Sequence, residues 1–251
     1  MRNVAITLSL LMAGTALACA GGDAGAEGGI GSSESALSFD PAQFCLESGM
    51  NAIIGTNADD VLTGTPGSDC IVGLDGNDVI DTGGGQDLVF AGAGDDRITG
   101  GGRYSELYGD AGQDTITAVE GARLLGGDGD DRIIGSQEND FIAGGAGQDL
   151  VMAQGGNDTI LGQEGDDRLF GGPGSDSIYG GEGQDYVSGD AGDDNLNGEV
   201  GDDTVLGGEG NDKVLECVGH NRIDAGVGTD SCTSNGTMST TVDCETVTTC
   251  P

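Results

Sequence analysis

Carboxylates recur in this sequence on a count of nine. When the chain from Gly55 to Thr233 is divided into nine-residue units, the sixth residue is aspartate in seventeen of twenty units. Stacked carboxylates repel one another unless a cation lies between them, and their oxygens are hard ligands. The column therefore predicts a row of oxygen-liganded metal sites formed by Asp60, Asp69, Asp78, Asp87, Asp96, Asp114, Asp131, Asp140, Asp149, Asp158, Asp167, Asp176, Asp185, Asp194, Asp203, Asp212 and Asp230.

Two further columns predict the elements that position these aspartates. Glycine fills the fourth place of seventeen units and allows backbone conformations that a side chain would forbid, so it favours tight turns. Two places after each of these aspartates except Asp230 stands an aliphatic residue, and the period of two in a strand turns this residue inward and its neighbours outward. The inward column is Leu62, Ile71, Ile80, Val89, Ile98, Leu107, Ile116, Ile133, Ile142, Val151, Ile160, Leu169, Ile178, Val187, Leu196, Val205, Val214 and Ile223.

The repeated unit itself resembles a known family. Units such as GGAGQDLVM, GGPGSDSIY and GGEGNDKVL resemble the nonapeptide GGxGxDxUx of the RTX, or hemolysin-type calcium-binding, family. The resemblance implies an all-β fold, a right-handed parallel β-roll of about ten coils in which each nonapeptide is one turn and one short strand. It implies Ca²⁺ as the cofactor, which agrees with the preference of this hard cation for six to eight oxygen ligands.

If successive turns alternate between two edges of the roll, residues eighteen apart stack on one another. One edge then carries eight adjacent aspartate pairs and the other carries six, so about fourteen ions are expected. Counting backward from Asp114 places Ser105, and counting forward places Arg123, at the sixth position of two units on the same edge, and one residue is missing before Asp131. The ladder of sites is therefore expected to break on that edge only.

Three interpretations of the break remain open. Arg103 and Arg123 could place guanidinium groups beside Asp87 or Asp140 in place of a cation. The break could also be the decay of a dispensable site. The third interpretation is a partner-binding notch that uses Arg103, Tyr104 and Glu106.

Composition restricts the class of protein. The 44 acidic residues against 8 Lys and Arg give a formal net charge of −36, which disfavours nucleic acid and anionic lipid as partners and favours cations. Aromatic residues make up 4% of the chain and tryptophan is absent, so the aliphatic core is small and we expect metal binding to supply the folding energy. One histidine and no HExxH or GxSxG motif lead us to expect no enzymatic activity.

The N-terminus predicts export. Residues 1–18 have a basic residue, an apolar run and a small-residue end, which are typical of a signal peptide. Cys19 follows directly, in a context that resembles a bacterial lipobox except for Ala16, and a Gly/Ser-rich tether covers residues 19–38. We expect an extracellular or cell-surface protein that contacts a membrane only through a lipid on Cys19; free secretion is the alternative.

Six cysteines remain for disulfides at the two ends of the array. Residues 39–54 form an expected N-terminal cap, with a short helix from Pro41 to a glycine stop at Gly49, and Cys45 is expected to pair with Cys70. Residues 55–233 are the β-roll and residues 234–251 a C-terminal cap. Among three possible pairings of the last four cysteines we favour Cys232 with Cys244 and Cys217 with Cys250, while zinc binding is the alternative.

The sequence predicts a structural or adhesive calcium-binding protein. The ninth position of alternate units forms an outward apolar column that could bind a cell-surface or matrix polysaccharide or a protein, although partial packing within the roll is the other interpretation. The alternative function is an accessory module of an extracellular enzyme or a secreted toxin-like effector. The apolar column consists of Phe90, Tyr108, Leu161, Tyr179 and Leu215, with Val72 and Ala143 between them.

Overall fold

The computed structural model describes residues 39–234 and 240–250, and residues from Asp40 onward form one compact unit. The predicted signal peptide, the tether and Cys19 lie outside the described residues. No helix among the described residues is long and apolar enough to cross a membrane.

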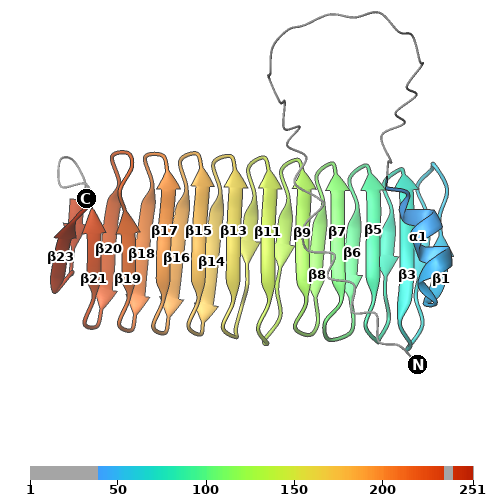
Figure 1. The fold of residues 1–251 in the computed structure, drawn as a ribbon, viewed down its shortest axis with the longest axis horizontal. Helices are drawn as coiled ribbons and strands as arrows, with labels where there is room; N and C mark the ends of the chain where they lie inside the picture. Colours follow the sequence, from blue (N-terminus) through green and yellow to red (C-terminus); the bar gives the residue numbers. More distant parts are fainter. Residues whose placement is uncertain (1–38, 235–239, 251) are drawn as a thin grey trace, which may run out of the picture. The chain divides into compact units, whose positions relative to one another are not determined.

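The unit begins with a short capped helix, α1 (Pro41–Ser48). The Oδ1 atom of Asp40 accepts a hydrogen bond from the backbone N of Gln43 at 3.1 Å, and Gly49 ends the helix with a φ of 83°. A left-handed φ favours glycine, so both helix ends follow from the sequence. The helix contacts β1 and β3, at the N-terminal end of the array (Figure 1).

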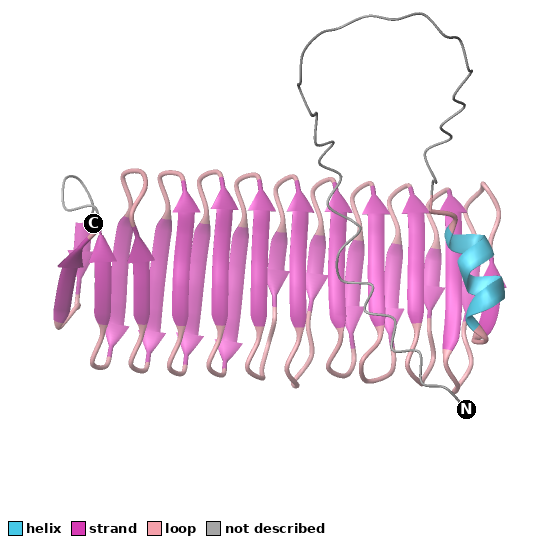
Figure 2. Cartoon of the chain, in the orientation of Figure 1, coloured by secondary structure: helices cyan, strands magenta, loops and turns pink. Residues whose placement is uncertain are grey.

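All other elements are parallel strands that form two sheets, and successive strands of the chain belong alternately to one sheet and the other (Figures 1 and 2). Strands eighteen residues apart pair in register, so two nonapeptides make one coil of a parallel β-solenoid. The twelve-stranded sheet contains β1 (Asn51–Ile54), β3 (Asp69–Asp75), β5 (Leu88–Ala93), β7 (Glu106–Ala111), β9 (Arg123–Asp128), β11 (Phe141–Ala146), β13 (Thr159–Glu164), β15 (Ser177–Glu182), β17 (Asn195–Val200), β19 (Lys213–Glu216), β21 (Ser231–Ser234) and β23 (Thr246–Thr249). The eleven-stranded sheet contains β2 (Val61–Thr63), β4 (Val79–Asp81), β6 (Arg97–Gly100), β8 (Thr115–Ala118), β10 (Arg132–Ile134), β12 (Leu150–Met152), β14 (Arg168–Pro173), β16 (Tyr186–Ala191), β18 (Thr204–Glu209), β20 (Arg222–Val227) and β22 (Thr240–Val242).

The all-β, parallel fold predicted from the repeats is confirmed. The solenoid makes about eleven coils against the ten expected, because β1 precedes the repeats and β22 and β23 follow them. The last two strands pair in parallel with β20 and β21, so the tail continues the solenoid by one coil.

The core is a single file of aliphatic side chains from each sheet. Every predicted inward residue from Ile71 to Ile223 is buried, while Leu62 in the first coil is half-buried. Residues before and after each inward position face outward, as the period of two requires. Because each strand from β3 to β20 places one larger aliphatic residue in the core, joined by an alanine in β5, β8 and β20, the apolar burial per coil is small.

Glycine is required where the turns of successive coils touch. Gly145 and Gly147 have φ values of 127° and 134°, which side chains rarely adopt. A Cβ atom at Gly147 would also collide with the carbonyl oxygen of Gly129 in the preceding coil. The glycine column therefore reflects both backbone conformation and the close stacking of turns.

Disulfides hold both ends. Cys45 of α1 pairs with Cys70 of β3, with a Cα–Cα distance of 5.3 Å. The favoured C-terminal pairing is also confirmed, with Cα–Cα distances of 5.7 Å for Cys217–Cys250 and 6.0 Å for Cys232–Cys244. The zinc interpretation is wrong, because these four sulfur atoms are bonded to one another.

Candidate metal centre

The position-six aspartates form two files, one along each edge of the solenoid, and one of the files is interrupted between Asp87 and Asp140. Asp158 is 2% exposed, and its Oδ1 atom accepts a hydrogen bond from the backbone N of Asp140 at 2.7 Å. The backbone N of Asp158 donates in turn to Oδ1 of Asp176 at 2.8 Å. The same bond joins every aspartate pair that the sequence placed in adjacent coils, eighteen residues apart except for Asp114 and Asp131, which are seventeen apart, so the predicted adjacency on both edges is confirmed.

The second oxygen of most of these carboxylates is buried and has no hydrogen-bond partner. A buried carboxylate oxygen without a partner is costly, so this arrangement requires a compensating charge. Fourteen of the seventeen predicted ligands share it: Asp78, Asp87, Asp96, Asp114, Asp131, Asp149, Asp158, Asp167, Asp176, Asp185, Asp194, Asp203, Asp212 and Asp230.

In the other three predicted ligands the second carboxylate oxygen has a hydrogen-bond partner. Each of these residues is the first aspartate of an uninterrupted run within its file, and we call such a file a ladder. Oδ2 of Asp60 accepts hydrogen bonds from N and Oγ1 of Thr56, at 2.6 and 2.9 Å. The same atom of Asp69 is bonded by Thr65, and that of Asp140 by Ser136. At these three positions protein donors already satisfy the oxygen that is left unpartnered elsewhere.

Backbone carbonyls converge on the unpartnered oxygens. A Cβ atom added at Gly162 would meet both Oδ2 of Asp167 and the carbonyl oxygen of Gly180, so the space beside this glycine is lined by two oxygens and admits no side chain. A position-six Oδ2 and a carbonyl oxygen of the next coil also flank Gly73, Gly109, Gly126, Gly144, Gly171, Gly180, Gly189 and Gly207.

This donor set fits a hard cation. Among the residues that the structure describes, no three Asp, Glu, His or Cys side chains come together as a metal-binding group, so carbonyls must contribute beside the carboxylates. Calcium accepts many oxygen ligands in forgiving geometry, whereas magnesium demands a stricter octahedron and gives up water reluctantly. The repeated arrangement of carboxylate and carbonyl oxygens thus suits calcium.

Burial changes the acidity of the ladder. It raises the pKa of Asp158 to about 7, and the neighbouring charges of Asp176 and Asp140 raise it further. Burial is also the main cause at Asp96, Asp131, Asp167 and Asp194, whose pKa values rise to about 7, and at Asp114, Asp149 and Asp185, whose pKa values rise to about 6. Without a cation, ionisation at neutral pH therefore opposes folding.

Acid is consequently expected to substitute in part for the metal. Between the ordinary aspartate pKa of about 3.9 and the raised values of about 6 to 7, the folded state binds more protons than the unfolded state. The stability of the metal-free fold is therefore greatest below about pH 4 and is lost as the pH rises through about 6 to 7. Circular dichroism in EDTA should show β-structure increasing reversibly on acidification.

Sedimentation velocity is the control for this experiment, because the sequence pI of about 4.1 favours association at low pH. Loss of β-structure by a monomeric chain on acidification would contradict the expectation.

A second ladder, which the sequence analysis missed, runs along the fifth position of the units. Oδ1 of Asp95 accepts a hydrogen bond from the backbone N of Gln113 at 3.0 Å, and Oδ1 of Asn139 accepts one from N of Asn157 at 2.8 Å. The signal was Asp or Asn at this position at spacings of eighteen. Other acceptors in this ladder are Asp59, Asn77, Asp130, Asn157, Asp166, Asp193, Asp202 and Asn211.

The predicted break on one edge is present, but Arg123 does not occupy the aspartate position. Ala122 does: its backbone N bonds to Oδ1 of Asp140 at 2.7 Å, and Leu124 is the buried inward residue of that strand. Arg123 pairs in register with Glu106 and Phe141 at the seventh position. Its guanidinium lies 4.4 Å from the ring centroid of Phe141, and the aspartate position is left without a carboxylate.

The second arginine of the break also avoids the ladder. Arg103 forms an ion pair with Glu138 and lies 5.9 Å from the ring centroid of Tyr104. Neither Asp87 nor Asp140 has an arginine partner among the ion pairs of the described residues. The hypothesis that guanidinium groups replace a cation here is therefore wrong.

The apolar column is only partly exposed. Phe90 is 1% exposed because it packs with Cys45, Cys70 and Val72 beneath the N-terminal cap, and the ring of Tyr108 stacks on it at 5.2 Å. The prediction that Phe90 and Val72 belong to an open binding surface is thus wrong.

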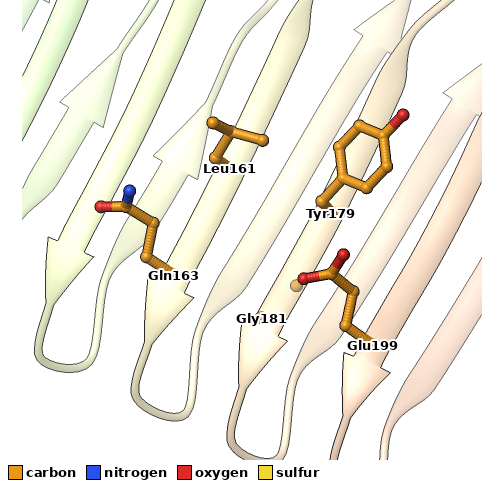
Figure 3. A pocket seen from close by; sticks show the side chains of 6 residues that line it. Leu161, Gln163, Tyr179, Gly181 and Glu199 are labelled. Carbon is orange, nitrogen blue, oxygen red and sulfur yellow. The ribbon is translucent and has the colours of Figure 1, made fainter. Parts of the chain in front are cut away.

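Farther along this sheet, neighbouring strands place Leu161 beside Tyr179. Both line a shallow pocket with Gln163 and Glu199, as Figure 3 shows. Here the column is half-buried, and the pocket has an acidic side chain on its rim.

Comparison with known families agrees with the geometry. The family model of the RTX calcium-binding nonapeptide repeat, which spans four copies, matches six stretches that together cover residues 54–214: residues 54–89, 90–125, 125–160, 152–187, 161–196 and 179–214. The chain belongs to this RTX repeat family. Calcium binding in a β-roll is the property of the family, and the two aspartate ladders are the expected source of its oxygen ligands here. Comparison with curated proteins returns no match.

Proposed function

We propose that this RTX chain is a calcium-folded structural and adhesive element outside the cell, with no catalytic site of its own. One observation carries the proposal: files of buried carboxylates follow both edges of the solenoid, one of them with a single break, and fourteen of their oxygens have no protein partner. Such a fold is stable only where calcium is plentiful, and extracellular modules bind this ion at ~0.1 to 1 mM. The fourteen aspartates with an unpartnered oxygen would serve as metal ligands, so their role is structural.

Export fits this dependence. A chain that cannot fold without calcium stays extended in a compartment poor in calcium and folds after it crosses the membrane. The signal-like residues 1–18, and Cys19 directly after them, support a route to the cell surface.

The proposal is tested on intact cells that produce the chain. With millimolar calcium in the medium, we expect the protein at the surface or in the medium, resistant to added protease and required for adhesion of the cells. EDTA should make the protein sensitive to protease and abolish adhesion of the cells. Magnesium should restore neither the protease resistance nor the adhesion. Retention inside the cell, or unchanged adhesion after deletion of the gene, would refute the proposal.

The substitution Cys19→Ser separates the two routes. A lipid-anchored chain would move from the cell surface to the medium, while a freely secreted chain would be unaffected. The matched control is Ser32→Ala in the tether, which leaves the cysteine in place.

A further inference from the structure

The outer face of the eleven-stranded sheet carries a row of arginines at the seventh position of alternate coils. Arg97 of β6 and Arg132 of β10 both pair in register with Thr115 of β8, and Arg132 and Arg168 both pair with Leu150 of β12. The three arginines therefore lie on one line, two strands apart. With a strand spacing of ~4.8 Å, each is ~9.6 Å from the next.

These arginines are unpaired in an acidic molecule. The ion pairs of the described residues are Arg103–Glu138 and Arg222–Asp224, and Arg97, Arg132 and Arg168 are exposed without a carboxylate partner. No acidic residue occupies the seventh or ninth position of any strand from β6 to β18 in this sheet. The seventh and ninth positions of these strands thus form a basic stripe on a chain of net charge −36, and the exposed Asp190 lies beyond them in β16.

Apolar and hydroxyl side chains fill the spaces between the arginines. Ile134, Met152 and Phe170 follow one another on the same face, each half-buried. The Phe170 and Tyr186 ring centroids are 5.5 Å apart, and the Arg168 guanidinium lies 5.7 Å from the Tyr186 ring. Such surfaces offer contacts to the faces of sugar rings, while arginine binds carboxylate or sulfate groups through paired donors.

The shape of the stripe restricts its partner. Each of its central strands is short, about three residues or ~10 Å in β10 and β12. Exposed aspartates stand in the turns that lead into β6, β10 and β14, at Asp95, Asp130 and Asp166. A membrane or a nucleic-acid duplex would press against these carboxylates, whereas one extended chain can lie along the stripe between them.

We propose that this face binds an acidic polysaccharide as a single extended chain, with its anionic groups on Arg97, Arg132 and Arg168. The separation of two strands suits an anionic group on every second sugar. The helix α1 contacts strands of the other sheet, and no other element of the described chain covers the stripe. The inference rests on the proposed adhesive function and gives it a ligand class.

The test uses the calcium-loaded mature chain and immobilised hyaluronan, which carries one carboxylate per disaccharide. Dextran sulfate is the sulfated probe and dextran the neutral one. The variant Arg97→Gln/Arg132→Gln/Arg168→Gln should bind the acidic polymers at least about tenfold more weakly than the wild type, with no binding of either protein to dextran. Preference between hyaluronan and dextran sulfate then identifies the anionic group.

A variant of identical net charge is the matched control. Arg103→Gln/Arg123→Gln/Lys213→Gln removes three cations from outside the stripe and should change affinity by less than about twofold. Equal weakening by both variants, or no binding of the wild type to either acidic polymer, would overturn the proposal. Binding only to duplex DNA or to vesicles of anionic phospholipid would overturn it as well.

A calcium titration followed by circular dichroism keeps this result separate from the proposed function. If all three proteins fold with calcium and none binds the polymers, the ligand assignment fails while calcium-dependent folding stands. If the wild type does not fold with calcium, the proposed function itself fails.

Discussion

Removal of calcium with EDTA at neutral pH is expected to abolish nearly all of the β-structure between β1 and β23. Each coil contributes little apolar burial, and each adds two position-six carboxylates whose buried oxygens lack a partner over most of the array. Without metal, these oxygens lose their only compensation and the ladders repel along both edges. We therefore expect metal binding to stabilise the folded state more than any other interaction in the chain.

The disulfides cannot replace the metal. Cys45–Cys70 constrains the first coils, and the other two bonds constrain the last ones. No disulfide lies between Cys70 and Cys217 in the described chain, so the central coils depend on the ladders alone.

Far-UV circular dichroism of the mature chain during a calcium titration measures this dependence. We expect a cooperative transition from coil to β-structure at ~0.1 to 1 mM calcium, and none with magnesium at the same concentrations. A full β-spectrum in EDTA at neutral pH would contradict the expectation, because the aliphatic file and the disulfides would then suffice.

The sequence was enough to predict the solenoid because each column of the repeat has its own physical cause. The aspartate, glycine and aliphatic columns keep the same phase over twenty units apart from one missing residue, and the strand pairs follow that phase. The failure was local. Counting forward from Asp114 reaches Arg123, whereas counting backward from Asp131 reaches Ala122, and neither residue is aspartate.

Tertiary pairing decides this ambiguity. Placing Leu124 inward aligns Leu125, Gly127 and Asp128 with their partners in β11, and the missing residue is absorbed in the turn before Ala122. The side-chain bonds that satisfy Asp60, Asp69 and Asp140 could not be predicted either. These bonds form where a turn has no aspartate stacked on it from the preceding coil. That depends on how the coils stack and not on the sequence of any one unit.

Substitution of Gly162 by alanine should strongly destabilise the central coils and disrupt a metal site between them. The added Cβ would collide with the carbonyl oxygen of Gly180 and with Oδ2 of Asp167, the two oxygens that line the expected metal site. The carbonyl belongs to the stacked backbone and cannot yield without separating two coils. We expect the free energy of unfolding of the calcium-loaded protein to fall by on the order of 3 to 5 kcal/mol.

Gly84→Ala is the matched control, because the nearest atom to its added Cβ is the Pro66 Cα at 3.8 Å and neither glycine has a positive φ. The free energy of unfolding of this variant should lie within about 0.5 kcal/mol of the wild-type value. The measurement is the calcium midpoint by circular dichroism together with the number of ions bound by calorimetry. Gly162→Ala should raise the midpoint and lower the number of ions. Equal behaviour of the two variants would mean that calcium does not lie between the carbonyl of one coil and the aspartate of its neighbour, and the metal would then have to bind at the exposed carboxylates of the turns.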